Sequence, residues 1–280
     1  MFISHLTAVN LRALDLISFT PHKNINIILG KNNDGKTSLL EGIYFSSSLK
    51  SFKSVASASL VQTGRQSTQL LLNVTKIHEN ISISIEKKLK GSNIVKINDS
   101  RASAKQLLTS FPVLALNFGV ENIITGPSES RRSLLDWGTF HVEHSYLDLY
   151  KNFNKALKQR NNILKKREID NLDYWDNLFI KYGDEIHNKR KDYFILLNKY
   201  FIDYKSKILE IIPDAYDDIK DSTLIFEQGW AKSLSLHESI SSLREKDLAL
   251  KHTSAGPHRC DIHFRSNGNN LKDMSSMSTQ

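Results

Sequence analysis

Residues 30–37 read Gly-Lys-Asn-Asn-Asp-Gly-Lys-Thr and match the phosphate-binding loop pattern, in which Gly-Lys-Thr follows an earlier glycine after four residues. A β-branched apolar run, residues 24–29, precedes this segment, and a helix-compatible run, residues 38–45, follows it. The order strand, loop and helix is the context that the motif requires. We therefore predict nucleotide binding here, the alternative being an ordinary glycine-containing turn between a strand and a helix.

The spacing of the motif follows from the chemistry of phosphate. Backbone N–H groups of such a loop point at the phosphate chain, and the next helix offers its positive end to the same anion. Lys36 would reach the β- and γ-phosphates, and the Thr37 hydroxyl would hold Mg²⁺. Asn32 and Asn33 stand where such loops often carry glycine, and asparagine tolerates positive φ. The predicted site comprises Gly30, Lys31, Asn32, Asn33, Asp34, Gly35, Lys36 and Thr37.

The composition of the 280-residue chain is ordinary for a soluble globular protein, with 40% apolar and 24% charged residues. No apolar run is long enough to span a membrane, and the N-terminus lacks the pattern of a secretory signal. The single cysteine, Cys260, excludes an intrachain disulfide, and we expect a cytoplasmic protein. The formal net charge of +8 favours a polyanionic partner.

The first half of the chain has the alternation of strands. Residues 2–20 predict paired strands, and residues 68–98 predict an antiparallel meander with a turn at residues 91–93. A short helix over 103–110 and a strand over 113–116 should follow. The polar segment 46–54 is either a solvated linker or a second phosphate contact through Lys50 and Lys53.

From Ser128, a candidate helix N-cap, the apolar period becomes helical. Residues 145–168 predict an amphipathic helix, and residues 171–210 predict a helical stretch of roughly 60 Å with Gly183 as a candidate break. Its aromatic residues favour a core between the two helices over a base-stacking surface. Pro213 should end the arm, before strands over 223–230 and 258–265, a helix over 233–246 and a turn over 267–270.

Several charged residues have two interpretations each. Arg131 and Arg132 are surface charges at a helix start, or they line a nucleotide or dimer surface. We favour the second interpretation, because two cations are unfavourable near a helix N-terminus. His258 and Arg259 could reach a phosphate or form a structural turn with Pro257. A basic run is a solvated helix face or a DNA contact, and it comprises Lys158, Arg160, Lys165, Lys166 and Arg167. The ten histidines have no metal-ligand spacing, so we expect no metal other than Mg²⁺.

Four blocks of the sequence together resemble the bacterial RecF family of recombination mediators over almost the whole chain. These blocks are Gly35–Tyr44, Gly126–Pro127 with Arg131–His141, Leu157–Asn162, and Ala255–Arg259 with Asp261. The resemblance implies an α/β fold: an ABC-type P-loop ATPase head, with a mixed sheet and an antiparallel meander, interrupted by an α-helical arm lobe. The expected domains are residues 1–127 for the head, 128–246 for the arm lobe, and 247–280 for a return to the head.

The resemblance also implies a function. Such a protein binds ATP and Mg²⁺, hydrolyses ATP slowly, dimerises on DNA in an ATP-dependent way, and binds single-stranded and gapped duplex DNA. With partner mediators it loads the strand-exchange protein in replication-gap repair and SOS processing. DNA contacts are expected from Lys50, Lys53, Lys158, Arg160 and Lys165.

The sequence departs from the family pattern at three places. Residues 276–280 lack the glycine of the signature segment, and the acidic strand with the catalytic carboxylates does not follow, so we expect a truncated sequence. Lys50 and Lys53 stand where the family favours arginine, and residues 117–119 replace its usual Pro-Glu. The alternative functions are a nucleotide-binding module without turnover, or another ABC or SMC-like ATPase such as the head of a phage-type nuclease.

Overall fold

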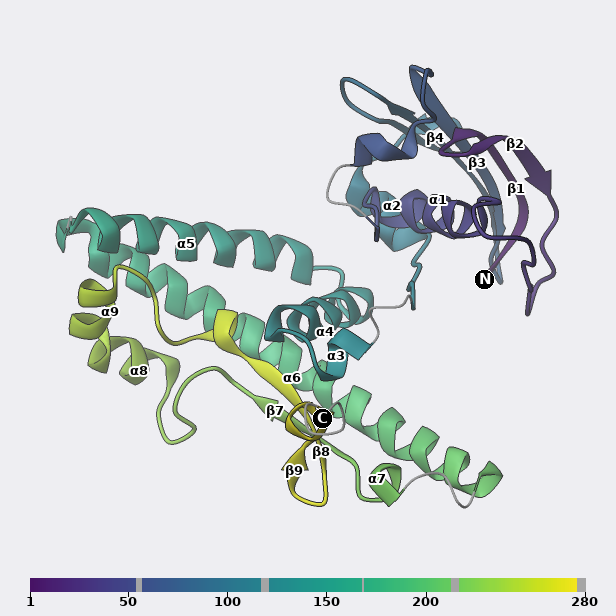
Figure 1. The fold of residues 1–280 in the computed structure, drawn as a ribbon. Coiled ribbons are helices and arrows are strands. Elements are labelled where there is room, and N and C mark those ends of the chain that lie inside the picture. The colour runs from purple at the N-terminus through teal and green to yellow at the C-terminus, as the bar shows by residue number, and fades with distance from the viewer. Residues whose placement is uncertain (54–56, 117–120, 168, 213–216, 276–280) are drawn as a thin grey trace. The chain divides into compact units, whose positions relative to one another are not determined.

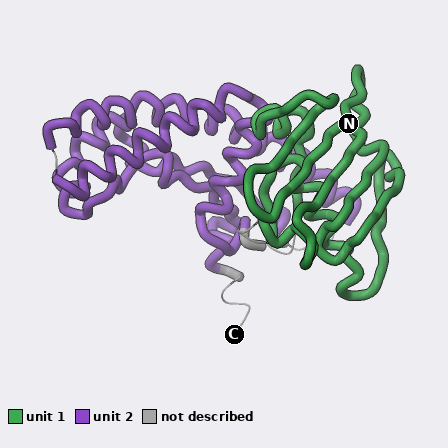
Figure 2. Tube along the Cα trace, turned by 90° about the horizontal axis from the view of Figure 1, so that it is seen from above, with its two compact units in different colours: residues 1–116 green, residues 117–280 purple. Residues whose placement is uncertain are grey.

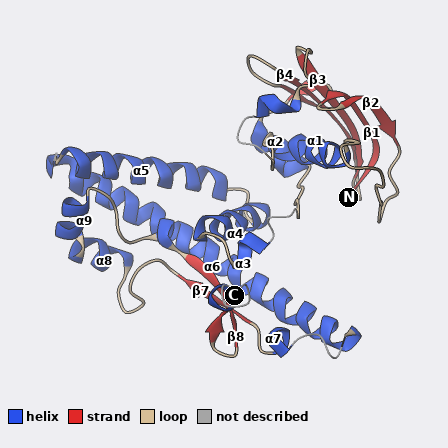
Figure 3. Cartoon of the chain, in the orientation of Figure 1, coloured by secondary structure: helices blue, strands red, loops and turns tan. Residues whose placement is uncertain are grey.

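A computed structural model describes the chain at residues 1–53, 57–116, 121–167, 169–212 and 217–275. Contacts divide the chain into two compact units, residues 1–116 and residues 117–280 (Figure 2). Each unit has its own antiparallel sheet and its own helices (Figure 3). Three expectations fall outside the described residues. They are the departure from the family pattern at 117–119, the end of the helical arm at Pro213, and the incomplete signature segment at 276–280.

Unit 1 is built around a six-stranded sheet in the order β2-β1-β3-β4-β5-β6, in which every described pairing is antiparallel. Its elements are β1 Phe2–Leu11, β2 Leu14–Phe19, α1 Lys36–Ser48, the 3₁₀ turn η1 Ser57–Leu60, β3 Ser67–Thr75, β4 Asn80–Lys88, β5 Ile94–Ile97, β6 Ser100–Arg101 and α2 Ala104–Ser110. The predicted strand pair over 2–20, the meander over 68–98 and the helix over 103–110 are confirmed.

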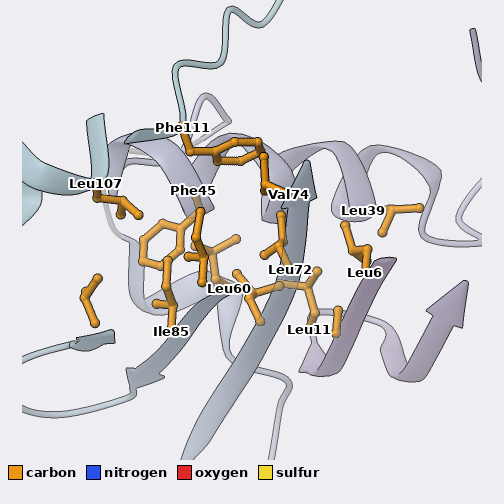
Figure 4. Close-up of a cluster of buried hydrophobic side chains, with 14 of the residues drawn as sticks. Leu6, Leu11, Leu39, Phe45, Leu60, Leu72, Val74, Ile85, Leu107 and Phe111 are labelled. Atoms are coloured by element: carbon orange, nitrogen blue, oxygen red, sulfur yellow. The ribbon is translucent and has the colours of Figure 1, made fainter. Parts of the chain in front are cut away.

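One face of this sheet holds the core of unit 1. Alternate residues of β3 and β4 are buried, and their cross-strand pairs place Leu70 opposite Ile85 and Leu72 opposite Ile83. Helices α1 and α2 lie along this face (Figure 1). Phe45 of α1 and Leu107 of α2 are fully buried among the sheet side chains (Figure 4). The core fixes α1, and therefore the loop that precedes it.

Two predicted strands of unit 1 are absent from the described residues. Residues 24–29 and 113–116 have no strand partner in the part of the chain that the structure describes. Most of their apolar side chains are exposed, including Ile27 at 80% and Leu29 at 86%, whereas Val113 packs partly buried against the core. Those two predictions were wrong for this structure, because a strand needs a neighbour to receive its backbone hydrogen bonds.

Unit 2 consists of helices packed around a long helix, with a three-stranded sheet in the order β7-β8-β9. Its elements are α3 Glu121–Ile124, α4 Ser128–Val142, α5 Tyr146–Lys166, the 3₁₀ turn η2 Ile169–Asn171, α6 Leu172–Ile211, α7 Asp217–Lys220, β7 Thr223–Glu227, α8 Leu236–Ser242, α9 Arg244–Leu250, the 3₁₀ turn η3 Pro257–Arg259, β8 Asp261–Ser266, β9 Asn269–Asn270 and α10 Leu271–Ser275. Helices α5 and α6 lie side by side (Figure 1).

Helix α6 runs unbroken for 40 residues, so the predicted break at Gly183 was wrong. Gly183 is buried, and a Cβ there would stand 2.6 Å from Cδ2 of Leu236. The missing side chain therefore serves the close approach of α8 rather than a kink. Phe179 packs on Phe153 of α5, as predicted for core aromatics, whereas Tyr204 is 61% exposed.

Other boundaries in unit 2 differ in detail from the predicted ones. Helix α4 has Pro127 as its N-cap and begins at Ser128, and the predicted helix over 233–246 is two short helices, α8 and α9. Residues 247–280 were expected to return to the head. In the structure β8 pairs with β7 within unit 2, and the expected division into head and arm lobe stays a prediction.

Candidate functional site

The loop at residues 30–37 folds around the ammonium group of Lys36. Its Nζ donates to the carbonyl oxygen of Gly30 at 2.8 Å and to that of Lys31 at 2.5 Å. These bonds hold a positive charge across the loop that leads into α1. Because α1 begins at Lys36, its first unpaired N–H groups face the same loop. The arrangement suits a phosphate group.

Left-handed backbone lets this loop turn. Asn33 has φ +73° and Gly35 has φ +89°, so asparagine does take up positive φ in the loop. At Gly35 a side chain is also sterically excluded, because a Cβ would stand 2.5 Å from Cδ2 of Leu14 at the start of β2. The sheet of unit 1 thus supports the loop directly.

Asp34 closes the loop from within. Its Oδ2 accepts a hydrogen bond from the backbone N–H of Lys31 at 2.5 Å. A Cβ on Gly30 would lie 2.9 Å from the same oxygen, so the first glycine of the motif makes room for this carboxylate. Thr37 is exposed at the first turn of α1, where its hydroxyl is open to a metal ion. The residues present therefore fit a magnesium–nucleotide complex.

The segment that follows α1 is tied to the helix by a buried carboxylate. Glu41 of α1 is fully buried and accepts from Nη2 of Arg12 at 2.8 Å, while its Oε2 is in ionic contact with Nε of Arg12 at 2.6 Å. The hydroxyl of Ser51 donates to the same carboxylate. Lys50 and Lys53 flank Ser51 and are both exposed. Their predicted contact with phosphate stays a prediction.

The basic residues predicted on α5 do not share one environment. Lys158 and Lys165 are exposed, as are Lys151 and Lys155 on the same helix. Arg160, in contrast, is completely buried, and its guanidinium contacts Asp176 at 2.6 Å and Asp247 at 2.7 Å. A guanidinium enclosed by two carboxylates cannot reach a DNA phosphate. The assignment of Arg160 as a DNA contact was therefore wrong.

Arg131 is also a structural residue rather than a surface cation. Its Nε and Nη2 bind the two carboxylate oxygens of Asp261 at 2.7 and 2.8 Å, and Nη1 donates to the carbonyl of Gly126 at 2.9 Å. The pair joins the start of α4 to β8. Burial is the largest single influence on Asp261 and opposes its ionisation, but the hydrogen bonds from Arg131 and the Ile262 N–H, together with the charge of Arg131, lower the carboxyl pKa below its ordinary value.

Sequence reasoning missed Arg190, a buried side chain that links several elements of unit 2. Arg190 of α6 binds Asp136 of α4 through Nη2 at 2.7 Å, and its Nη1 donates to the carbonyl of Pro257 at 2.7 Å. The Tyr146 hydroxyl donates to Asp136 at 2.5 Å, and burial raises the pKa of this tyrosine. The Leu-Asp of the second sequence block could have indicated Asp136, but no spacing in α6 distinguishes Arg190.

His258 and Arg259 form the 3₁₀ turn η3 with Pro257, which is the structural interpretation of that motif. The His258 Nε2 lies 3.1 Å from the carbonyl oxygen of Thr253, so Nε2 carries the proton and donates it. Burial lowers the pKa of His258 to about 4. Arg259 is exposed.

A cavity of about 210 Å³ lies within unit 2, where α4, α5, α6 and η3 meet. Its walls include Arg132, Asp136, Tyr150, Phe153, Asn154 and His258. Arg132 and Asp136 come from the second sequence block and His258 comes from the fourth. Residues that the chain separates by more than a hundred positions therefore converge on one space.

The described residues contain no group of three or more His, Cys, Asp and Glu side chains arranged to hold a metal ion. Among the same residues, no helix combines the length and the apolar character that a membrane crossing requires.

A phosphate-binding loop on an antiparallel sheet unit, followed by a unit with a long helical pair, defines an ABC-type ATPase head with a helical lobe. No family model matches the chain. The DNA replication and repair protein RecF of Pseudoalteromonas translucida is 34% identical over 281 residues, which cover 98% of this chain and 74% of that protein. RecF of Nitrosococcus oceani is 30% identical, over 100% of this chain and 76% of that protein. The chain therefore belongs to the RecF family.

Solved structures agree with this fold. The recombination mediator protein RecF-ATPrS of the RecFOR pathway superposes with a TM-score of 0.84 and 22% identity, over 99% of this chain and 77% of that one. RecF-ATP of the same pathway has a TM-score of 0.82 over 97% and 75%. The expected fold class, an ABC-type head with a helical lobe, is confirmed.

Proposed function

We propose that this chain is an ATP-dependent DNA-binding protein of recombinational repair that acts at replication gaps and in SOS processing. Its relatives are DNA replication and repair proteins, and this supports the general role. The observation that carries the nucleotide part is the Lys36 ammonium, held by the carbonyls of Gly30 and Lys31 at the start of α1. It presents a positive charge and unpaired N–H groups to a phosphate chain.

In this proposal the loop from Gly30 to Thr37 binds the phosphates of ATP. Lys36 contacts the β- and γ-phosphates, and Thr37 supplies a hydroxyl ligand to Mg²⁺. The bound ion neutralises phosphate charge when it is present. Asp34 keeps the loop closed through its bond to the Lys31 N–H, so that the site is formed before the nucleotide arrives.

The DNA part of the proposal rests on exposed lysines. Lys158 and Lys165 on α5, with Lys50 and Lys53 after α1, bind phosphates of single-stranded and gapped duplex DNA. Their affinity comes from counterion release and needs no base sequence. We further propose an ATP-dependent homodimer in the cytoplasm that works with partner mediators to load the strand-exchange protein.

Calorimetry with ATP and Mg²⁺ tests the nucleotide site. Lys36→Ala should weaken binding about tenfold or more, because it removes a charged hydrogen-bond donor to phosphate. Lys23→Ala removes an exposed lysine outside the loop and is the matched control. Undiminished binding by the Lys36 variant would contradict the assignment of the loop.

Filter binding across a salt series tests the DNA contacts. Lys158→Ala and Lys165→Ala should each weaken binding to all DNA sequences alike and reduce the salt slope by about one. If a variant has the same salt slope as the wild type, the substituted lysine does not contact DNA phosphate. Absence of DNA binding at low salt, with ATP and Mg²⁺ present, rejects the proposed function.

A further inference from the structure

We propose that the cavity between α4, α5, α6 and η3 binds a single unpaired nucleobase of DNA. The inference rests on the proposed DNA binding and adds a site at which a base, rather than a phosphate, is held. The cavity of about 210 Å³ has room for one small planar group but not for a segment of folded protein.

The charges of the cavity wall favour an uncharged ligand. The wall contains two guanidinium groups, of Arg132 and Arg190, and two carboxylates, of Glu129 and Asp136, and Arg190 is paired with Asp136 at 2.7 Å. The formal charge of the wall is therefore zero. A phosphate would need a net positive site, whereas a nucleobase is neutral.

The remaining wall offers what a base needs. The half-buried Tyr150 supplies an aromatic ring on which any base can stack, and Phe153, which is 1% exposed, backs the wall from within the core. Asn154 carries a donor and an acceptor on one planar amide, the group that pairs with the edge of a base. Every hydrogen bond that Asp136 accepts from the described residues ends on Oδ1, so its Oδ2 is left to accept from a ligand.

The wall is held in place before any ligand binds. Arg190 fixes Asp136 and the carbonyl of Pro257, and Arg132 donates through Nη1 to the carbonyl of Cys260 at 3.0 Å. Both arginines thus tie the wall to the backbone at η3. A preformed pocket loses little entropy when a base enters it.

The position of the cavity on α5 connects it with the lysines. Tyr150, Asn154 and Lys158 are spaced by four residues and lie along one stripe of the helix. Lys151 and Lys155 are exposed on the adjacent stripe. A strand whose phosphates contact these lysines can turn one base into the cavity, which is the combination typical of sites for single-stranded nucleic acid.

Fluorescence anisotropy with two labelled oligomers of equal length tests this inference, one oligothymidylate and one with abasic residues throughout. At low salt with ATP and Mg²⁺, the wild-type chain should bind the thymidylate at least about fivefold more tightly, the lower end of stacking by one base. Tyr150→Ala should bring that ratio close to one while affinity for the abasic oligomer is unchanged. Tyr150→Phe keeps the aromatic face and should keep the ratio.

Lys155→Ala is the matched control, because it should weaken both oligomers equally and preserve the ratio. Asn154→Ala gives a second variant should Tyr150→Ala not fold, and it should also lower the ratio. A wild-type ratio of one, or a ratio that survives Tyr150→Ala and Asn154→Ala, overturns the base pocket and leaves phosphate binding intact. Failure to bind either oligomer overturns the proposed function instead.

Discussion

The two units of the chain use different interactions to fix their helices. In unit 1 the helices α1 and α2 are held on the sheet by apolar side chains such as Phe45 and Leu107. Beside them, the buried Glu41 pairs with Arg12, whose side chain is 22% exposed. In unit 2 buried arginines cross between elements, and the pairs are Arg131–Asp261, Arg160–Asp176, Arg160–Asp247 and Arg190–Asp136. Apolar packing tolerates small shifts, whereas a buried ion pair requires one geometry. The helical unit is therefore the one whose arrangement depends on single residues.

Removal of the Arg160 guanidinium should have the largest effect on stability. Arg160→Ala leaves Asp247, which is fully buried, without its cation, and leaves Asp176 with only a longer contact of 4.0 Å to Arg244. Loss of one partner of such a pair costs about 3–5 kcal/mol. Urea unfolding should therefore show a markedly lower midpoint for this variant.

Lys158→Ala is the control for that experiment, because Lys158 lies two residues away on α5 and is exposed. Its free energy of unfolding should stay within about 0.5 kcal/mol of the wild type. Equal effects of the two variants would mean that Arg160 does not hold the helices together.

The contrast between apolar packing and buried ion pairs also determines which features the sequence can predict. Alternation at Leu70, Leu72 and Val74 predicted β3, because the period of two is visible in the residues themselves. Arg160 and Lys158 have no such difference in sequence, since both stand in one basic run. Only the tertiary contacts of α5 with α6 and α9 place one of them inside the protein.

The candidate sites were predictable to different degrees for a related reason. The loop from Gly30 to Thr37 is contiguous, so its pattern of glycine, lysine and threonine predicted both its geometry and its chemistry. The cavity in unit 2 joins Asp136, Tyr150 and His258 from three separate elements. No stretch of consecutive residues indicates that these three side chains meet. The apolar run over 24–29 was misleading, because hydrophobicity alone does not supply a pairing partner.

Truncation of a core leucine in unit 1 should destabilise it without a dependence on pH. Leu72 is 1% exposed and lies opposite Ile83 on the buried face of the sheet. Leu72→Ala should cost about 2–5 kcal/mol through lost transfer energy and the cavity that remains. Hydrogen exchange of β3 and β4 at pH 4 and at pH 7 should give the same loss. A loss confined to one pH would imply an ionisable group in this core.

The stability of unit 2, in contrast, should fall on acidification. Burial lowers the pKa of His258 from 6.5 to about 4, so between these values the unfolded chain binds a proton that the folded chain does not. Stability contributed by the neutral ring is complete above pH 6.5 and is lost as the pH falls towards 4, by about 3 kcal/mol.

His258→Gln should remove most of that loss, because glutamine does not titrate and its amide can still donate to the carbonyl of Thr253. The half-buried His141 and His187, whose pKa values burial also lowers, leave a smaller dependence of stability on pH with the same sign. Urea unfolding at pH 7 and pH 4.5 measures the difference. If the variant loses as much stability between pH 7 and pH 4.5 as the wild type, groups other than His258 cause the acid sensitivity.

The smallest expected loss of stability comes from removing a helix cap. It can be compared between two equivalent caps, one in each unit. Ser103 caps α2 and Ser235 caps α8, and each serine hydroxyl accepts from the N–H of the third helical residue, while that residue's side chain accepts in return from the serine N–H. Alanine at either position should cost about 1 kcal/mol. Because α2 carries Leu107 into the core of unit 1, Ser103→Ala should lower hydrogen-exchange protection throughout the sheet. Ser235→Ala should act mainly on α8, since the buried arginines hold the rest of unit 2. If both substitutions lowered hydrogen-exchange protection over equally large regions, the proposed difference between the units would be wrong.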